Sequence, residues 1–249
     1  MILIENLQKS FNINNGLIIL FQGLTFEVIE GQFLTILGPN GCGKSTLLNL
    51  ITGIDKLYTG QIKVKGQLDK ISTNVAYMLQ KDLLLPWLTV KENIYLGVKI
   101  QGKFNSQTDK KIDTYLDSLN ILKLKNHYPS KLSGGEKQKV ALIRTLVLDT
   151  PILLLDEPFS AIDYNTRLEL QKTIFTYAES NNTTVILISH DIDEAIAVSD
   201  RILIFDHKPR GIRLDIKVEL QIRDRNPVTA RQDPEFSRYY NTIWQNYPR

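Results

Sequence analysis

The chain has 249 residues, of which 43% are hydrophobic and 23% charged, and its formal net charge at pH 7 is +3. This composition is typical of a globular protein with enough apolar residues for a substantial core. The basic residues are scattered rather than grouped in a stripe, so charge does not argue for a nucleic-acid-binding protein. The single cysteine excludes an intramolecular disulfide.

The sequence also bears on location. It has no apolar run near the roughly 20 residues that span a bilayer. Its first residues, Met1 to Asn6, lack the basic region and long apolar core of a signal peptide. We therefore expect a cytosolic protein, with any membrane work done through a partner.

The first part of the chain predicts strands. Ile2 to Leu7 is typical of a short strand, followed by a polar loop over residues 12–16, and Leu24 to Val28 alternates like a half-exposed strand. Further on, Gly60 to Gly66 alternates again, which predicts an antiparallel strand, and Val75 to Leu79 predicts a buried one.

Between these strands lies a glycine-rich loop. It follows the apolar run Phe33 to Leu37 and precedes a helical pattern over residues 47–51, and it comprises Gly38, Pro39, Asn40, Gly41, Cys42, Gly43, Lys44, Ser45 and Thr46. Strand, glycine-rich loop and helix form the context of a phosphate-binding loop. Glycines let backbone amides converge on an anion, and the helix directs its positive end to the same place. Lys44 could then reach the β- and γ-phosphates while Ser45 ligates Mg²⁺, so this loop predicts a nucleotide site.

The second half of the chain changes character. Residues from Val90 to about Leu148 show helical patterns, and Ser133 to Glu136 has the form of a capping box. Ile152 to Leu155 and Val185 to Ile188 are apolar runs typical of parallel strands covered on both faces, with Tyr164 to Ser180 as a crossover helix. Further strands are expected over residues 202–205 and 212–220, followed by a polar tail. The pattern predicts an α/β core interrupted by a helical subdomain at about 85–150.

Two carboxylates follow the first of these apolar strands. Asp156 and Glu157 would lie at the carboxyl end of a parallel strand, where ligands of open α/β sheets bind. Asp156 could hold Mg²⁺ through water, and Glu157 could orient an attacking water. His190 and Gln80 also follow strands, but each alone could be only a helix cap or a polar strand end.

Together these motifs give a specific resemblance. Six motifs occur in the order and approximate spacing of one family. They are the phosphate loop, Gln80, the Leu132–Glu136 segment, the acidic pair, the Ser160–Asp163 segment and His190. The chain resembles the nucleotide-binding subunit of an ATP-binding cassette (ABC) transporter over almost its whole length. Ser133-Gly134-Gly135 is the discriminating motif, because other phosphate-loop ATPases lack it. The resemblance implies one nucleotide-binding domain over residues 1–249, with a phosphate-loop ATPase core of mainly parallel sheet, an antiparallel β subdomain, the helical subdomain, and a tail at about 221–249.

The resemblance implies roles for particular residues. Phe11 matches the aromatic residue that stacks on adenine, although it could equally be core. Gln80 matches the residue that senses Mg²⁺, and Asp163 the one that bridges two subunits. The resemblance also makes Glu157 the general base and His190 the γ-phosphate contact. Ser133 and Gly135 would contact ATP bound by the opposite subunit, so it implies ATP, Mg²⁺ and a homodimer.

Two residues of these motifs need comment. Glu136 stands where many family members have Gln, but as the third residue of a capping box it should turn back toward the backbone. Cys42 lies between phosphate-loop glycines, beside a helix N-terminus and Lys44, which favours a thiolate. We expect a maleimide to inactivate the protein and ATP to protect it.

An unusually apolar loop indicates a branch of the family. Leu83 to Leu88 would dock a helix of the permease, with Trp87 as anchor, or else fill a small local core. The segment resembles importer ATPases of the nitrate, sulfonate and taurine branch, whose relatives also serve thiamine precursors. That implies uptake of a small solute through a separate permease, with an extracytoplasmic binding protein and a location at the cytoplasmic membrane face. The alternatives are an ABC exporter subunit or a non-transport ABC protein.

Overall fold

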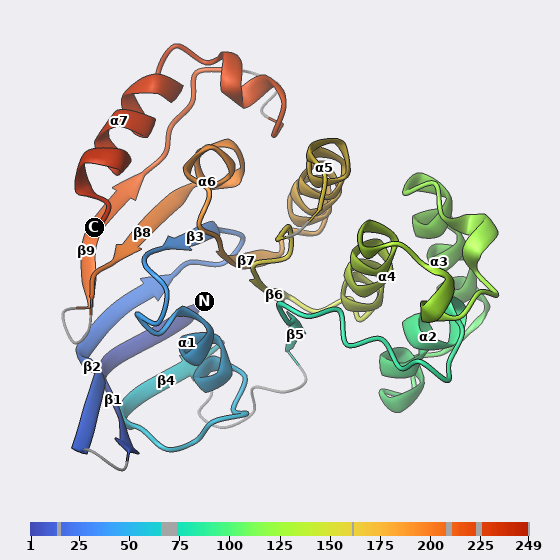
Figure 1. Ribbon diagram of the computed structural model, residues 1–249, viewed down its shortest axis with the longest axis horizontal. Helices are drawn as coiled ribbons and strands as arrows, with labels where there is room; N and C mark the ends of the chain where they lie inside the picture. Colours follow the sequence, from blue (N-terminus) through green and yellow to red (C-terminus); the bar gives the residue numbers. More distant parts are fainter. Residues whose placement is uncertain (14–15, 66–73, 161, 208–210, 223–225, 249) are drawn as a thin grey trace.

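A computed structural model of the chain describes residues 1–13, 16–65, 74–160, 162–207, 211–222 and 226–248 (Figure 1). It contains two β-sheets and a lobe of helices at one side. Within the described ranges, no helix has the length and apolar character needed to cross a membrane.

The smaller sheet is antiparallel and has the strand order β2-β1-β4. Its strands are β1 (Ile2–Ile13), β2 (Gly16–Val28) and β4 (Thr59–Val64). This confirms the antiparallel strand expected near residue 60, of which Gly66 lies outside the described residues.

The larger sheet has six strands in the order β5-β6-β7-β3-β8-β9. All neighbours are parallel except β8 and β9, which are antiparallel. The strands are, in sheet order, β5 (Val75–Met78), β6 (Ile152–Asp156), β7 (Thr184–Ile188), β3 (Phe33–Leu37), β8 (Arg201–Phe205) and β9 (Ile212–Lys217). Every residue of β3, β6 and β7 is buried, as expected for parallel strands covered on both faces.

Helices cover the larger sheet and build the side lobe. They are α1 (Lys44–Ile51), α2 (Val90–Ile100), α3 (Ser106–Ser118), α4 (Gly134–Leu146), α5 (Tyr164–Asn181), α6 (Ile192–Val198) and α7 (Phe236–Asn246), with short 3₁₀ turns η1 (Leu122–Leu124), η2 (Pro129–Lys131) and η3 (Thr229–Gln232). The helices α2 and α3 lie at the far edge of the lobe, and α4 lies between them and the sheet (Figure 1). The helical stretch expected from about residue 90 to 148 is therefore present.

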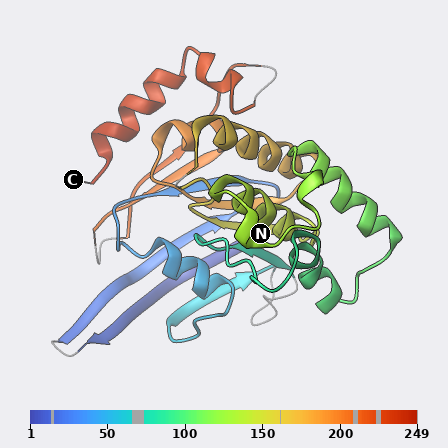
Figure 2. The same ribbon diagram turned by 45° about the vertical axis from the view of Figure 1, so that its right-hand side comes forward.

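The core has two layers, one on each face of the larger sheet. Alternate strand residues such as Leu153 and Leu155 pack with α4, α5, α6 and α7. Their neighbours Ile152 and Leu154 pack instead with α1 and the antiparallel sheet. The view in Figure 2 shows these layers, with α7 outermost on the helical side.

Two expectations were wrong. The first strand continues past Leu7 to Ile13, and the second begins at Gly16 rather than Leu24, so the expected loop falls within a long hairpin, of which residues 14–15 lie outside the described residues. Its polar residues are compatible with strands because backbone pairing satisfies the ladder while one face meets solvent. The polar tail contains α7, which buries Phe236 and Ile243 two turns apart against the core. Aromatic and apolar residues at helical spacing signal this helix, and it was missed because the tail was treated as polar.

Candidate nucleotide site

Four loops meet at one edge of the larger sheet. The phosphate loop follows β3, Gln80 follows β5, Asp156 and Glu157 end β6, and His190 follows β7. These four strands are consecutive neighbours and parallel, so their carboxyl ends share one edge. The fold thereby assembles side chains more than 100 positions apart in the chain.

The phosphate loop depends on its glycines. Gly38, Gly41 and Gly43 have φ values of 153°, 75° and 112°, conformations that L side chains rarely adopt. A Cβ at Gly43 would also lie 2.6 Å from the Phe21 ring. Lys44 is 6% exposed and its Nζ donates to the carbonyls of Gly38 at 2.7 Å and Pro39 at 3.0 Å. The ammonium group is therefore held over the loop that would carry the phosphates.

Ser45 and Asp156 form the second part of the site. The Ser45 hydroxyl donates to Asp156 Oδ1 at 3.0 Å, and the Tyr77 hydroxyl donates to Asp156 Oδ2 at 3.4 Å. Burial raises the pKa of Asp156, while the hydrogen bond from Ser45 opposes that shift and the nearby charge of Glu157 adds to it. A bound cation would favour the ionised carboxylate, so this pair suits a positively charged ligand.

Glu157 occupies the centre of the site. Its backbone is in the left-handed region, with φ 47°, and its amide donates to the carbonyl of Ile188 at 3.0 Å. Gln80 Nε2 donates to Glu157 Oε2 at 3.0 Å, and His190 Nδ1 lies 3.7 Å from the same oxygen. Such backbone strain in a non-glycine residue is concentrated at functional sites. The structure thus brings Gln80, Glu157 and His190 together, as the order of motifs suggested.

These residues border a cavity of about 610 Å³. One wall is apolar and comes from the hairpin, where Phe11 pairs with Ile18. Phe11 is 40% exposed, so it is not a core residue, and its exposed ring could contact a ligand. The lining comprises Phe11, Ile18, Leu20, Asn40, Gly41, Gly43, Lys44, Ser45, Thr46, Gln80 and Glu157. Sequence reasoning missed Ile18 and Leu20, because β2 was expected to begin after them.

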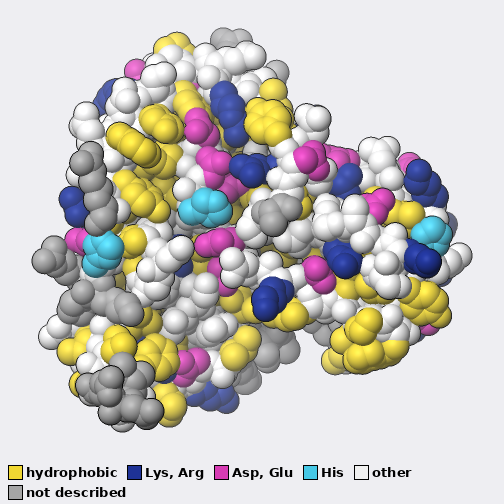
Figure 3. All heavy atoms as spheres, viewed as in Figure 1, with side chains coloured by type: hydrophobic (Ala, Val, Ile, Leu, Met, Phe, Trp, Pro, Cys, Tyr) yellow, Lys and Arg dark blue, Asp and Glu magenta, His cyan; other side chains and the backbone are white. Residues whose placement is uncertain are grey.

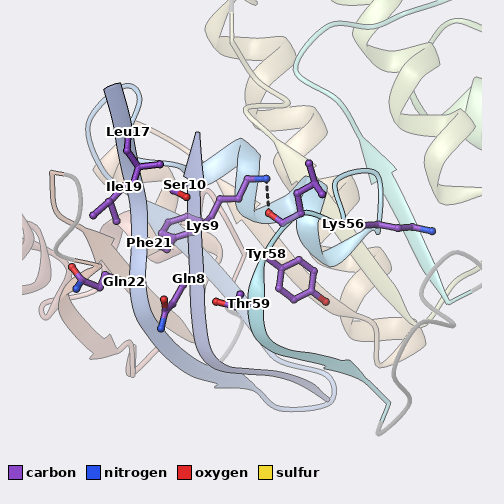
Figure 4. Close-up of a pocket in the computed structure, with 11 residues that line it drawn as sticks. Gln8, Lys9, Ser10, Leu17, Ile19, Phe21, Gln22, Lys56, Tyr58 and Thr59 are labelled. Carbon is purple, nitrogen blue, oxygen red and sulfur yellow. Dashed lines mark hydrogen bonds between the residues drawn. The ribbon is translucent and has the colours of Figure 1, made fainter. Parts of the chain in front are cut away.

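A second cavity, of about 540 Å³, is lined by other residues of the same hairpin and by residues 56–59 (Figure 4). It is lined by Leu17, Ile19 and Phe21, the alternate residues of β2. The Lys9 ammonium is buried there, but it is already paired with Asp55 at 2.6 Å and with the carbonyl of Leu57 at 2.7 Å. Its lining contains no residue of the phosphate loop, so we assign the nucleotide site to the first cavity.

Ser133, Gly135 and Asp163 lie outside the lining of the nucleotide cavity. Ser133 caps α4, and Glu136 accepts from the Ser133 amide at 2.8 Å, which confirms that Glu136 turns back toward the backbone. A Cβ at Gly135 would lie 3.5 Å from Thr166 at the start of α5. Asp163 caps α5, and the hydrogen bond from the Thr166 amide lowers the pKa of Asp163. Of the segment before Asp163, residue 161 lies outside the described residues.

The expectation of a reactive thiol at Cys42 was wrong. Its side chain is 4% exposed and packs in the apolar layer beneath the loop, with Phe21 and Leu47. The loop therefore directs this side chain into the core, and Cys42 can serve a bound phosphate only through its backbone.

The fold and this site are those of a phosphate-loop nucleotide-binding protein. The site has a cation held over a glycine-rich loop, a hydroxyl–carboxylate pair, and a glutamate beside a histidine. Comparison with known proteins agrees: residues 21–160 match the family model for the ABC transporter. The chain belongs to this family, and it is an ATPase of the ABC transporter type.

Relatives and a solved structure extend this result. The chain is 38% identical to "Uncharacterized ABC transporter ATP-binding protein YtlC" of Bacillus subtilis, covering 88% of this chain and 85% of that protein. It is also 38% identical to "Aliphatic sulfonates import ATP-binding protein SsuB" of Bacillus cereus, covering 87% and 86%. The fold is similar to the ATP-binding cassette MJ0796, described as a dimeric post-hydrolysis state bound to ADP and Pi, with a TM-score of 0.78, 26% identity, and coverage of 88% and 99%.

Proposed function

We propose that the chain is the ATP-hydrolysing subunit of an importer and that it works as a homodimer on a separate membrane permease. The observation that carries this proposal is the division of the expected nucleotide contacts. The phosphate loop, Asp156, Glu157 and His190 converge at one sheet edge, whereas Ser133 and Gly135 lie outside that cavity. A second copy of the chain would bring its own signature residues to the open side of the site.

The geometry supports the roles that the resemblance implies for these residues. ATP enters the cavity with adenine against Phe11 and the phosphates over the loop, where Lys44 balances their charge. Glu157 acts as general base toward water, and His190 contacts the γ-phosphate from the neighbouring strand end. Gln80 touches the base and also begins the loop that leads to the helical lobe.

The residues present fit Mg²⁺. A hydroxyl and a carboxylate, Ser45 and Asp156, offer hard oxygen ligands 3.0 Å apart, and Gln80 adds an amide oxygen at the edge of the cavity. In the described part of the chain no group of three or more His, Cys, Asp or Glu side chains could hold a metal. Bound by Ser45 and Asp156, Mg²⁺ would neutralise charge on the phosphates.

The second half of each site comes from the partner copy. Ser133 begins α4 and Asp163 begins α5, and Gly135 lies beside Thr166, so both motifs occupy one patch. The exposed Ser133 and the helix amides suit a γ-phosphate presented from outside. The dimeric state of the similar cassette supports this arrangement.

The apolar loop after Gln80 is the proposed permease contact. Trp87 is 69% exposed and Leu83 53%, whereas Leu84 is buried, so only part of the loop fills a local core. The loop is held firmly: Arg144 of α4 donates to the carbonyls of Asp82 and Leu83 at 2.5 and 2.9 Å. Movement of α4 would therefore be transmitted to this loop.

The surface of the helical lobe agrees with such a contact. Apolar side chains gather on the part of the lobe formed around α2 in Figure 3, while charged groups of both signs are mixed over the rest of that face. Contiguous apolar surface of this kind marks an interaction site. We infer that the subunit sits at the cytoplasmic face of the membrane through this contact.

The solute belongs to the same proposal. The relative named for import of aliphatic sulfonates supports uptake of a sulfonate. The resemblance of the Leu83–Leu88 segment adds taurine, nitrate and a thiamine precursor as candidates. The test is co-purification of the tagged chain from its native membranes. A multi-span permease together with an extracytoplasmic solute-binding protein is the expected result. A permease without any binding protein would contradict import and favour the exporter alternative, and a purely soluble complex would favour a non-transport role.

A further inference from the structure

A buried polar cluster lies directly behind His190. Its centre is Glu194 of α6, which is 4% exposed. One carboxylate oxygen accepts from Gln171 Nε2 of α5 at 2.8 Å, and the other accepts from the hydroxyl of Ser189 at the end of β7. A buried carboxyl is costly, so full pairing of both oxygens indicates a built network rather than chance burial.

The Ser189 hydroxyl links this carboxyl to the histidine loop. It donates to Glu194 and at the same time accepts from the Asp191 amide at 3.0 Å. Ser189 precedes His190 and Asp191 follows it. One hydroxyl therefore fixes the backbone on both sides of His190. This holds as long as the Glu194 carboxyl accepts the hydroxyl hydrogen, because the hydroxyl oxygen is then free to accept from the Asp191 amide.

A second tie runs to α5, the helix that Asp163 caps. Arg167 NH1 donates to Asp191 Oδ2 at 3.0 Å, one turn before Gln171 reaches Glu194. Two atoms of this tie, Arg167 Nε and Gln171 Oε1, are buried without a hydrogen-bond partner in the described structure. Gln171 thus retains a spare acceptor next to the carboxyl.

The charged groups around Glu194 come from several elements. Burial raises the pKa of Glu194 to about 7, the Asp191 charge adds to the shift, and Ser189, Gln171 and Arg167 oppose it. Glu157 and His190 border the same small cavity as Glu194. From η3, Arg231 acts on Asp193, the neighbour of Glu194 on α6. The Glu194 carboxyl therefore changes charge close to neutral pH, and burial is the largest cause of its raised pKa.

We propose that Glu194 is a positioning residue for His190 and that its ionised form holds the histidine loop in the orientation needed for turnover. The proposal rests on the role proposed above for His190 at the γ-phosphate. The ionised carboxylate accepts two hydrogen bonds, and the charge strengthens the bond from Ser189. Protonation removes that charge and turns one oxygen into a donor, for which the spare Gln171 oxygen is the available acceptor after its amide flips. The hold on Ser189 then weakens.

The test is the pH profile of ATP turnover in Glu194→Gln, an uncharged side chain of the same shape. The two proteins differ only at residue 194, so the ratio of wild-type to variant kcat isolates the contribution of Glu194. We expect this ratio to be near one below pH 6 and to rise about tenfold by pH 8.5, with KM for ATP unchanged. A ratio that is constant with pH would overturn the proposal.

Further variants protect this test from loss of folding. Ser189→Ala should lower kcat at pH 8.5 and flatten the profile, since it removes the link while leaving Glu194 in place. Thr150→Val, which removes a buried hydrogen bond to the Ile152 carbonyl at the start of β6, is the matched control and should keep the wild-type profile. If Thr150→Val also loses the wild-type pH profile of kcat, a general loss of packing explains the change and the proposal is wrong.

The His190→Ala variant separates this inference from the proposed function. Normal turnover in that variant would refute the role of His190 and both proposals that use it. Greatly reduced turnover in His190→Ala combined with a flat ratio for Glu194→Gln would refute only the role of Glu194.

Discussion

The sheet edge and the helical lobe treat their functional residues differently. At the sheet edge Lys44, Ser45, Asp156 and Glu157 are each held by a hydrogen bond to another part of the site. On the lobe, Ser133 bonds within its own helix start and remains exposed. The phosphate-loop half of the proposed site is therefore assembled within the chain, whereas Ser133 lies outside the lining of the nucleotide cavity in the described residues.

This difference between the sheet edge and the lobe suggests how ATP binding can be separated from ATP hydrolysis. The sheet edge contains what a single subunit needs to bind ATP: an anion cradle, a cation and an apolar wall. In the proposed dimer, the lobe contributes to the site only when a second copy presents it. ATP bound at the edge would then act as the ligand that favours the closed dimer over the open one.

The largest expected effect comes from removing the cation at the sheet edge. Lys44→Ala should lower ATP affinity strongly and reduce turnover by about a thousandfold or more, because Lys44 is the one cationic side chain of the loop over residues 38–46. Nucleotide binding by calorimetry and phosphate release measure the two effects. His190→Ala is the contrasting variant and should keep ATP binding while turnover falls. Equal loss of binding in both would contradict the assigned roles.

The next effect tests whether the two halves meet. Glu157→Gln keeps the contact with Gln80 and the ligands of ATP but removes the base, so turnover should fall by at least about a hundredfold. The variant should then accumulate as a dimer with ATP and Mg²⁺ in size-exclusion chromatography. A second change, Ser133→Arg, should prevent that dimer without affecting ATP binding. A Glu157→Gln protein that stays monomeric with ATP would refute the composite site.

A smaller effect on the isolated subunit is expected at the lobe. Trp87→Ala should abolish transport and permease pull-down, yet change the free energy of unfolding by less than about 0.5 kcal/mol, because the side chain is 69% exposed. Basal ATPase should stay near normal. Leu84→Ala is the matched control, since Leu84 is buried and its loss should lower stability by about 2–5 kcal/mol. An unstable Trp87→Ala variant that still binds the permease would end the docking hypothesis.

Much of this division was predictable from the sequence because the relevant signals are local. The glycine spacing around Lys44 and the capping box at Ser133 each determine a turn within a few residues. Fully apolar runs such as Ile152–Leu155 likewise predict buried parallel strands without knowledge of the fold. The order of strands could not be derived in this way, and only that order explains why Gln80 and His190 reach Glu157.

The failures have physical causes too. Phe11 stands between the polar residues Ser10 and Asn12, and its strand β1 is recognisable only from its backbone pairing with β2. Ile18 lies in the apolar run Leu17 to Phe21, which was not recognised as part of β2. The helix α7 is polar on one side, so its few buried contacts carry little weight in composition. Glu194 attracted no notice because a glutamate near a helix start is ordinarily solvated. Its burial depends on the tertiary placement of Gln171 and Ser189.

The smallest expected effect concerns Cys42, where local chemistry and packing disagree. A helix N-terminus and a lysine favour a thiolate, but the loop turns this side chain into the apolar layer at 4% exposure. Maleimide should therefore label the folded protein at least about a hundredfold more slowly than the urea-unfolded chain, since reaction requires local opening. Cys42→Ala should keep ATP turnover within about twofold, because the backbone rather than the thiol faces the phosphates. Thiol-labelling kinetics with and without ATP decide the matter: rapid labelling that saturating ATP abolishes would place the sulfur in the cavity and refute the buried orientation.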